Sequence, residues 1–277
     1  MSFISYLING ISLGSVYAII ALGYTMVYGI AKMLNFAHGD VIMVGAYTIF
    51  AAVCTVLGIA IEAVAYRPLR QAASSLVVLI TAIGVSYFLQ NVALLIFGAN
   101  TKAFTSVVTV PAISLAGGQI IITGETIVTI ISCIVIMVGL TLFVNKTKAG
   151  QAMQAVSEDR GAAQLMGINV NGTISLTFAI GSALAAIAGM LLCSSYPALT
   201  PYTGSMPGIK AFVAAVFGGI GSIPGALIGG IILGVIEILS KAYISSHLSD
   251  AIVFLVLILV LLVKPTGILG KKIQEKV

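Results

Sequence analysis

The 277-residue chain is too apolar for a water-soluble protein: 60% of its residues are hydrophobic, 8% are charged, and its mean hydropathy is +1.17. Soluble domains carry about 25% charged residues, so the composition excludes a soluble enzyme, a nucleic-acid-binding protein and a disordered chain. Thirteen Lys and Arg against eight Asp and Glu, a net charge of +5, is the usual surplus of a membrane protein with a basic cytoplasmic side.

Eight apolar segments predict an all-α, polytopic bundle of transmembrane helices that forms one domain over residues 1–277. They cover residues 3–30, 41–65, 76–97, 120–144, 174–193, 209–220, 226–239 and 251–263. The last three contain only about 12 to 14 residues, which is short for a span of about 20. We therefore expect tilted, broken or re-entrant helices in this part of the chain.

A polar break at residues 34–40 separates the first two apolar segments and contains Asn35, His38 and Asp40. Such side chains are costly at membrane depth unless they line a cavity or find partners. One interpretation is a re-entrant or broken helix beside a transport path. The other is a surface turn in which His38 caps a helix, and the sequence does not choose between them.

Two amides, Gln90 and Asn91, lie in the middle of the apolar segment 76–97. They either line a path or form hydrogen bonds between helices, and the second role is the commoner one.

The longest polar segment, residues 146–169, predicts a short helix that Ser157 or Asp159 caps and that Gly167 ends in a left-handed conformation. An apolar edge on this helix favours docking to a cytoplasmic partner, because a solvated connector has no need to expose Leu165, Met166 and Ile168 together. A plain connector remains the alternative. The edge also includes Ala162 and Ala163.

The basic residues indicate which loops are cytoplasmic, since nine of the thirteen lie in residues 66–70, 146–160 and 264–276. We place these three segments in the cytoplasm. Residues 98–119 and 194–207 then lie outside, while the orientation of the N-terminus stays open.

Glycines are dense in residues 216–234, where Gly221, Gly225 and Gly229 recur every four residues. This spacing predicts close helix packing, and residues 218–225 with Pro224 predict a tight break between two short helices.

No catalytic or metal-binding motif is visible: the chain contains no P-loop, HExxH or GxSxG sequence, and its three cysteines are scattered singly. We expect Glu62 to pair with Arg67, and Glu237 to pair with Lys241 four residues later. Intramembrane charge is too scarce for a typical ion-coupled transporter. The chain is thus predicted to be no enzyme, and its energy to come from a partner.

Several segments together resemble the permease subunits of high-affinity branched-chain amino acid ABC importers, almost from end to end. They are residues 9–18, 23–30, 35–40, 66–70, 158–169, 218–226 and 265–270. The resemblance implies a multi-pass protein of the bacterial cytoplasmic (inner) membrane. It also implies a second homologous permease, two ABC ATPase subunits that bind the ATP, and a periplasmic substrate-binding protein, with no cofactor on this chain.

The same resemblance makes residues 146–169 the segment that couples the permease to its ATPase, and it sets Asn35 and His38 near the translocation path. The expected coupling residues are Gly150, Glu158, Asp159, Arg160, Leu165, Met166 and Gly167. The expected path residues are Asn35, His38, Gln90 and Asn91.

Two departures from the family accompany the resemblance. Between residues 47 and 66 the chain is shorter than expected by about one span of 20 residues, so two spans have merged or one is missing. Gln151 and Gln154 stand where the family has basic residues. The alternatives to an amino acid importer are a permease for urea or short amides and a secondary transporter or channel that works without ATP.

Overall fold

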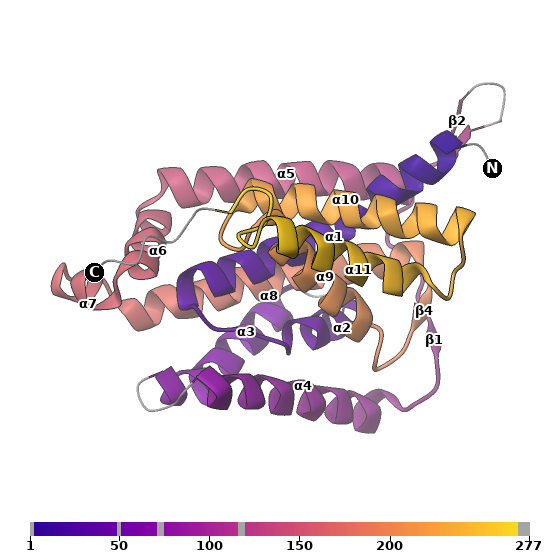
Figure 1. Ribbon diagram of the computed structural model, residues 1–277. Helices are drawn as coiled ribbons and strands as arrows, with labels where there is room; N and C mark the ends of the chain where they lie inside the picture. The colour runs from indigo at the N-terminus through magenta and orange to yellow at the C-terminus, as the bar shows by residue number, and fades with distance from the viewer. Residues whose placement is uncertain (1–2, 49–50, 71–74, 116–119, 271–277) are drawn as a thin grey trace.

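The structure, a computed structural model, describes residues 3–48, 51–70, 75–115 and 120–270. Long helices lie side by side and short strands gather at one end (Figure 1). The helices are α1 (Phe3–Ala31), α2 (His38–Thr48), α3 (Ala51–Ile61), α4 (Ser75–Phe97), α5 (Gly124–Lys146), α6 (Lys148–Glu158), α7 (Arg160–Leu165), α8 (Val170–Ser195), α9 (Ser205–Gly218), α10 (Ile223–Tyr243) and α11 (Ser249–Val263). The predicted all-α membrane fold is confirmed.

Short irregular elements complete the chain. A π-helical turn η1 (Glu62–Tyr66) and a 3-10 turn η2 (Pro68–Arg70) follow α3. Strand β1 (Lys102–Ala103) pairs antiparallel with β4 (Ala198–Leu199), and β2 (Ile113–Leu115) pairs antiparallel with β3 (Ile120–Ile122). The pairing of β1 with β4 joins the two segments predicted to lie outside, because residues 102–103 belong to the first and residues 198–199 to the second.

Within the described residues, five helices are long and apolar enough to cross a membrane: α1, α4, α5, α8 and α10. The prediction of a short helix over residues 226–239 is wrong, because α10 has 21 residues. It begins earlier, where the Ser222 side chain accepts from the amide of Gly225, and continues past Glu237 to Tyr243. The other two segments that were expected to be short form the short helices α9 and α11, with 14 and 15 residues.

The apolar segment 41–65 is divided between two helices and is not one merged span. Tyr47 of α2 stacks on Phe97 at the last residue of α4, with ring centroids 4.1 Å apart. The Cys54 thiol of α3 reaches back to the carbonyl of Val41 at 3.7 Å. α2 therefore runs towards the end that carries the strands, and α3 returns from it.

Helix α1 lies at the centre of the bundle and is almost wholly buried along residues 10–27. Glycines let α10 approach it closely: a Cβ atom at Gly234 would lie 2.2 Å from the Gly14 nitrogen. Gly229 likewise faces the backbone of Ala214 in α9. The predicted packing role is confirmed at these glycines. Gly221 differs, because it has a φ of 91° in the turn before α10 and a Cβ atom added to it would meet no atom within 4 Å.

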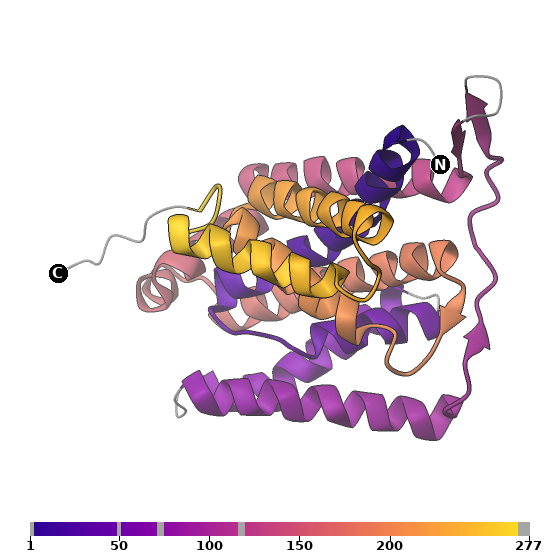
Figure 2. The same cartoon turned by 45° about the vertical axis from the view of Figure 1, so that its right-hand side comes forward.

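The two ends of the bundle differ in charge. The basic end holds α6, α7 and the end of α11, and the opposite, strand-bearing end holds the beginning of α1 (Figure 1, Figure 2). Arg160 of α7 donates a hydrogen bond to the carbonyl of Ala31, the last residue of α1. The first span therefore begins at the strand-bearing end and finishes at the basic end, an orientation that the sequence left open.

A candidate translocation path and a coupling segment

The break between α1 and α2 is buried, so the interpretation of residues 34–40 as a surface turn is wrong. Asn35, His38 and Asp40 are each at most 2% exposed. Lys32 takes a φ of 52° where α1 ends, and His38 begins α2 after its amide bonds the carbonyl of Asn35 at 3.1 Å. The polar residues thus lie at the joint of a broken helix inside the bundle.

Asp40 is the centre of a polar cluster that joins three helices. It accepts hydrogen bonds from Ser86 at 2.5 Å and from Gln90 at 2.9 Å, both on α4. The same Gln90 amide lies 3.3 Å from the hydroxyl of Ser205 at the start of α9. This cluster satisfies a carboxylate that would otherwise be costly at this depth.

The other predicted path residues lie around this cluster in different ways. Asn35 accepts from the Tyr66 hydroxyl at 3.1 Å. His38 packs against the Tyr24 ring at 4.6 Å, and its Nε2 atom has no hydrogen-bond partner within the described residues. Asn91 is exposed and donates to the carbonyl of Tyr87 in its own helix at 2.7 Å, so it does not join the cluster.

The predicted coupling segment folds as two capped helices, α6 and α7. The Thr147 side chain accepts from the amide of Gly150 at 3.0 Å, and the Asp159 side chain accepts from the amides of Gly161 and Ala162. Gly167 has a φ of 81° directly after the C-cap of α7. The predicted cap at Asp159 and the predicted stop at Gly167 are both confirmed.

The coupling segment is anchored on one side and bare on the other. Met153 and Val156 of α6 are buried, and a Cβ atom at Gly150 would lie 2.4 Å from the Phe143 carbonyl oxygen, so the end of α5 leaves no room for a side chain there. Leu165 and Met166 are 90% and 82% exposed. The predicted apolar edge is narrower than expected, because Ala163 is buried and Ile168 is half-buried against the core.

The charged residues of the coupling segment are also partly exposed and partly anchored. Glu158 and Asp159 are exposed, whereas Arg160 is half-buried through its bond to Ala31. Gln154, one of the two residues that depart from the family pattern, is exposed and bonds Asn145 at 3.1 Å.

An ion pair forms at the basic end, between η1 and the residue that follows it. Arg67 donates to Glu62 at 2.9 Å, as predicted, and Glu62 also accepts from Ser175 of α8 at 2.5 Å. The hydrogen bond that Arg67 donates to the Glu62 carboxylate raises the pKa of the guanidinium, which stays charged.

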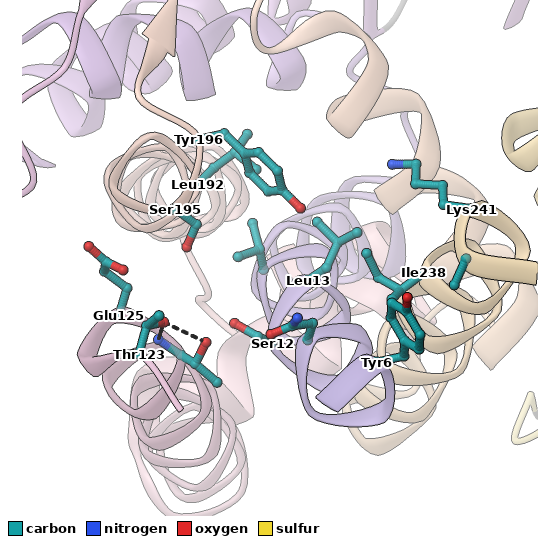
Figure 3. A pocket seen from close by; sticks show the side chains of 14 residues that line it. Tyr6, Ser12, Leu13, Thr123, Glu125, Leu192, Ser195, Tyr196, Ile238 and Lys241 are labelled. Carbon is teal, nitrogen blue, oxygen red and sulfur yellow. Dashed lines mark hydrogen bonds between the residues drawn. The ribbon is translucent and has the colours of Figure 1, made fainter. Parts of the chain in front are cut away.

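At the strand-bearing end a pocket of about 540 Å³ opens between α1, α5, α8 and α10. Leu13 and Leu192 lie between Glu125 on one side and Lys241 on the other, with Tyr196 beside Leu192 (Figure 3). A second pocket, of about 250 Å³, shares Leu13, Leu192, Tyr196 and Lys241 with the first. The two pockets therefore meet at Lys241.

Four charged side chains form a network beside these pockets. Glu237 pairs with Lys241 at 2.6 Å, as predicted, and also with Lys210 at 2.8 Å, while Lys210 reaches Asp250 at 2.7 Å. The Tyr17 hydroxyl donates to Glu237 at 2.9 Å. Lys210 and Asp250 were missed from the sequence, although a lysine directly after Ile209 in an apolar segment was a visible signal.

No group of three His, Cys, Asp or Glu lies close enough to hold a metal ion in the part of the chain that the structure describes. The polar groups of the Asp40 cluster bond one another, and so do those of the Glu237 network.

Comparison with known proteins agrees with this architecture. A family model described as the permease component of branched-chain amino acid transport systems matches residues 6–261. The chain is 45% identical to the high-affinity branched-chain amino acid transport system permease protein LivH of Salmonella typhimurium, covering 99% of this chain and 98% of the relative. It is 43% identical to BraD of Pseudomonas aeruginosa, with the same coverage.

A more distant similarity is to the probable branched-chain amino acid transport permease protein LivH of Methanocaldococcus jannaschii, at 30% identity over 91% of this chain and 88% of the relative. The alignment with the Salmonella protein extends over 311 positions, more than the 277 residues of this chain. The relative therefore has internal residues that this chain lacks. No solved structure matches the chain.

Proposed function

The chain belongs to the family of branched-chain amino acid transport system permease components, and from this premise we propose that it is the membrane-spanning subunit of an ATP-driven importer. Its substrates are branched-chain or related small amino acids. The chain carries no P-loop sequence, so ATP is bound and hydrolysed by separate subunits.

The proposed assembly contains this chain, a second homologous permease, two cytoplasmic ATPase subunits and a periplasmic substrate-binding protein, in a bacterial cytoplasmic membrane. The basic end faces the cytoplasm, in keeping with its Lys and Arg residues. The strand-bearing end, with the pocket of about 540 Å³, faces the binding protein.

The observation that carries the ATP-driven part of the proposal is the exposed tip of the coupling segment. Leu165 and Met166 are almost fully exposed on a helix that is capped at both ends, and burying such side chains against a partner is favourable by about 1.5–3 kcal/mol each. Glu158 and Asp159 flank the tip with negative charge. We assign this tip to the groove of an ATPase subunit.

The bond from Arg160 to Ala31 provides the link from that tip to the interior. Movement of α7 acts directly on the last turn of α1, which leads within a few residues to Asn35 and His38. Gln90 and Asp40 then connect the same broken helix to α4 and α9. We propose that this joint changes packing as the permease alternates between its two access states.

Reconstituted vesicles test the proposal. The full transporter, with ATP enclosed on the side of the basic end and binding protein on the other, is expected to accumulate labelled leucine only when ATP is present. Purification of this chain without any ATPase, together with leucine transport in vesicles that lack ATP, would overturn the proposal. Transport of urea or short amides instead of leucine would assign a different substrate class.

A further inference from the structure

The pockets at the strand-bearing end contain a cation in a position to bind a ligand. We propose that these pockets form a low-affinity binding site for an α-amino acid on the permease itself, in which Lys241 holds the carboxylate. The choice of amino acid as ligand rests on the proposed function, whereas the site rests on the pocket and its charges.

Lys241 is the lysine of the network that remains available. Lys210 is 6% exposed and contacts two carboxylates, Glu237 at 2.8 Å and Asp250 at 2.7 Å. Lys241 contacts Glu237 at 2.6 Å, its side chain is 37% exposed, and it lines both pockets, whereas Lys210 lines only the smaller one. An ammonium group has three donors, so Lys241 can bind an incoming carboxylate without giving up Glu237.

Glu237 fixes the position of that ammonium. It is buried, and it accepts from three groups on different helices: Tyr17 of α1, Lys210 of α9 and Lys241 in its own helix. Because the network contains two cations and two anions, a bound anion would leave it with an excess of negative charge, whereas a zwitterion adds none. The site therefore favours a ligand whose own ammonium balances its carboxylate.

The walls next to Lys241 suit an aliphatic side chain. Leu13 and Leu192 separate Lys241 from Glu125, the carboxylate on the far side of the larger pocket (Figure 3). Ile238 lies one turn before Lys241 on the same wall. With one lysine and one glutamate in its lining, the larger pocket is close to neutral, and Glu125 disfavours a ligand with a second carboxylate, such as glutamate.

The test uses the full chain with the subunits that co-purify with it, in lipid nanodiscs without binding protein. Binding of labelled leucine is measured at equilibrium for the natural sequence, for Lys241→Met and for Lys241→Arg. The control is Lys102→Met, which removes an exposed lysine at the same end, near the Phe97 ring. Leucine, leucinamide and glutamate are compared as competitors.

We expect saturable leucine binding that Lys241→Met weakens about tenfold or more, since it removes one charge-assisted bond. Lys241→Arg is expected to restore most of the affinity, and Lys102→Met to leave it unchanged. Leucinamide, which lacks the carboxylate, and glutamate are expected to compete at least tenfold less well than leucine.

Absence of saturable binding to the natural sequence would overturn the inference, as would equal competition by leucinamide and leucine. The competition series needs no variant, so it decides the matter even if Lys241→Met fails to fold. ATP-dependent uptake without binding in nanodiscs would refute only this site. Binding without ATP-dependent uptake would refute the proposed function and leave the site standing.

Discussion

Two features, one at each end of the bundle, place side chains against their usual preference. At the basic end, Leu165 and Met166 are exposed on the capped tip of the coupling segment. At the strand-bearing end, Lys210 and Glu237 are buried in a network of ion pairs. The tip exposes apolar side chains that are normally buried, and the network buries charged side chains that are normally exposed.

The difference indicates which of the two features is compensated by groups within the chain. Buried charges are stabilised only by partners close at hand, and the network supplies them within the chain. The exposed apolar tip is not covered by any other part of the chain that the structure describes, so only a further surface could bury it. The tip therefore keeps an exposed apolar surface, whereas the network holds its charges in fixed positions beside a pocket.

Removing the common anion of the network is expected to have the largest effect. Glu237→Gln would leave Lys241 without its carboxylate and the buried Lys210 with Asp250 alone, and should lower the free energy of unfolding by about 3–5 kcal/mol. Denaturant unfolding in detergent measures this loss. Glu125→Gln, in the half-exposed wall of the pocket, should cost less than about 1 kcal/mol. Equal losses would show that burial of the network does not matter.

Placing a charge on the exposed tip should weaken assembly and leave folding intact. Leu165→Asp is expected to reduce affinity for the ATPase subunits by about 1.5–3 kcal/mol, or roughly 10- to 150-fold, because the burial of one leucine is lost. Co-purification at graded ATPase concentrations measures it. Val107→Asp, at an exposed apolar residue of the other end, is the matched control and should bind ATPase normally. If both variants lost the ATPase equally, the tip would have no special role.

Two neighbouring amides of α4 have different surroundings: Gln90 belongs to the buried polar cluster, and Asn91 lies on the helix surface. Gln90→Leu leaves Asp40 with one hydrogen bond fewer inside the bundle and should destabilise the protein by about 1–3 kcal/mol. Asn91→Leu removes only an exposed bond within α4 and should change stability by about 0.5 kcal/mol or less. Thermal unfolding of the two variants side by side gives the answer, and a larger loss for Asn91→Leu would contradict the arrangement described.

The smallest effect is expected at the end of α7. Gly167→Val forces a β-branched residue into a left-handed conformation, at a cost of about 1–2 kcal/mol, so the tip should fray while membrane insertion continues. Gly139→Val is the control, because Gly139 lies in the regular part of α5 and a Cβ atom added there would meet no atom within 4 Å. Hydrogen exchange at residues 160–166 should rise in the first variant alone; unchanged exchange there would count against a strained stop at Gly167.

Local spacing was enough to predict some of these features. The pair Glu237–Lys241 lies on one helix at four residues' separation, and the cap at Asp159 and the stop at Gly167 depend only on neighbouring backbone. The break at residues 34–40 was visible as polar residues between apolar segments.

Features that depend on how helices turn towards one another were not predicted. Lys210 and Asp250 meet because α9 and α11 present these residues to each other, and no spacing along the chain encodes that. Gln90 was visible as a polar residue in an apolar span, but its partners Asp40 and Ser205 come from two other helices. The division of residues 41–65 between α2 and α3 likewise depends on packing against α4 and α8.

We propose that the coupling segment transmits the effect of ATP hydrolysis to the interior through Arg160 and the end of α1. The most direct measurement is the number of ATP molecules hydrolysed per leucine imported by the reconstituted transporter carrying Arg160→Glu, with Lys148→Glu, an exposed charge reversal in α6, as control. We predict that Arg160→Glu keeps ATPase activity while uptake falls about tenfold or more, so that the ratio rises, and that Lys148→Glu stays near the natural ratio. Uptake and ratio unchanged in Arg160→Glu would contradict the account.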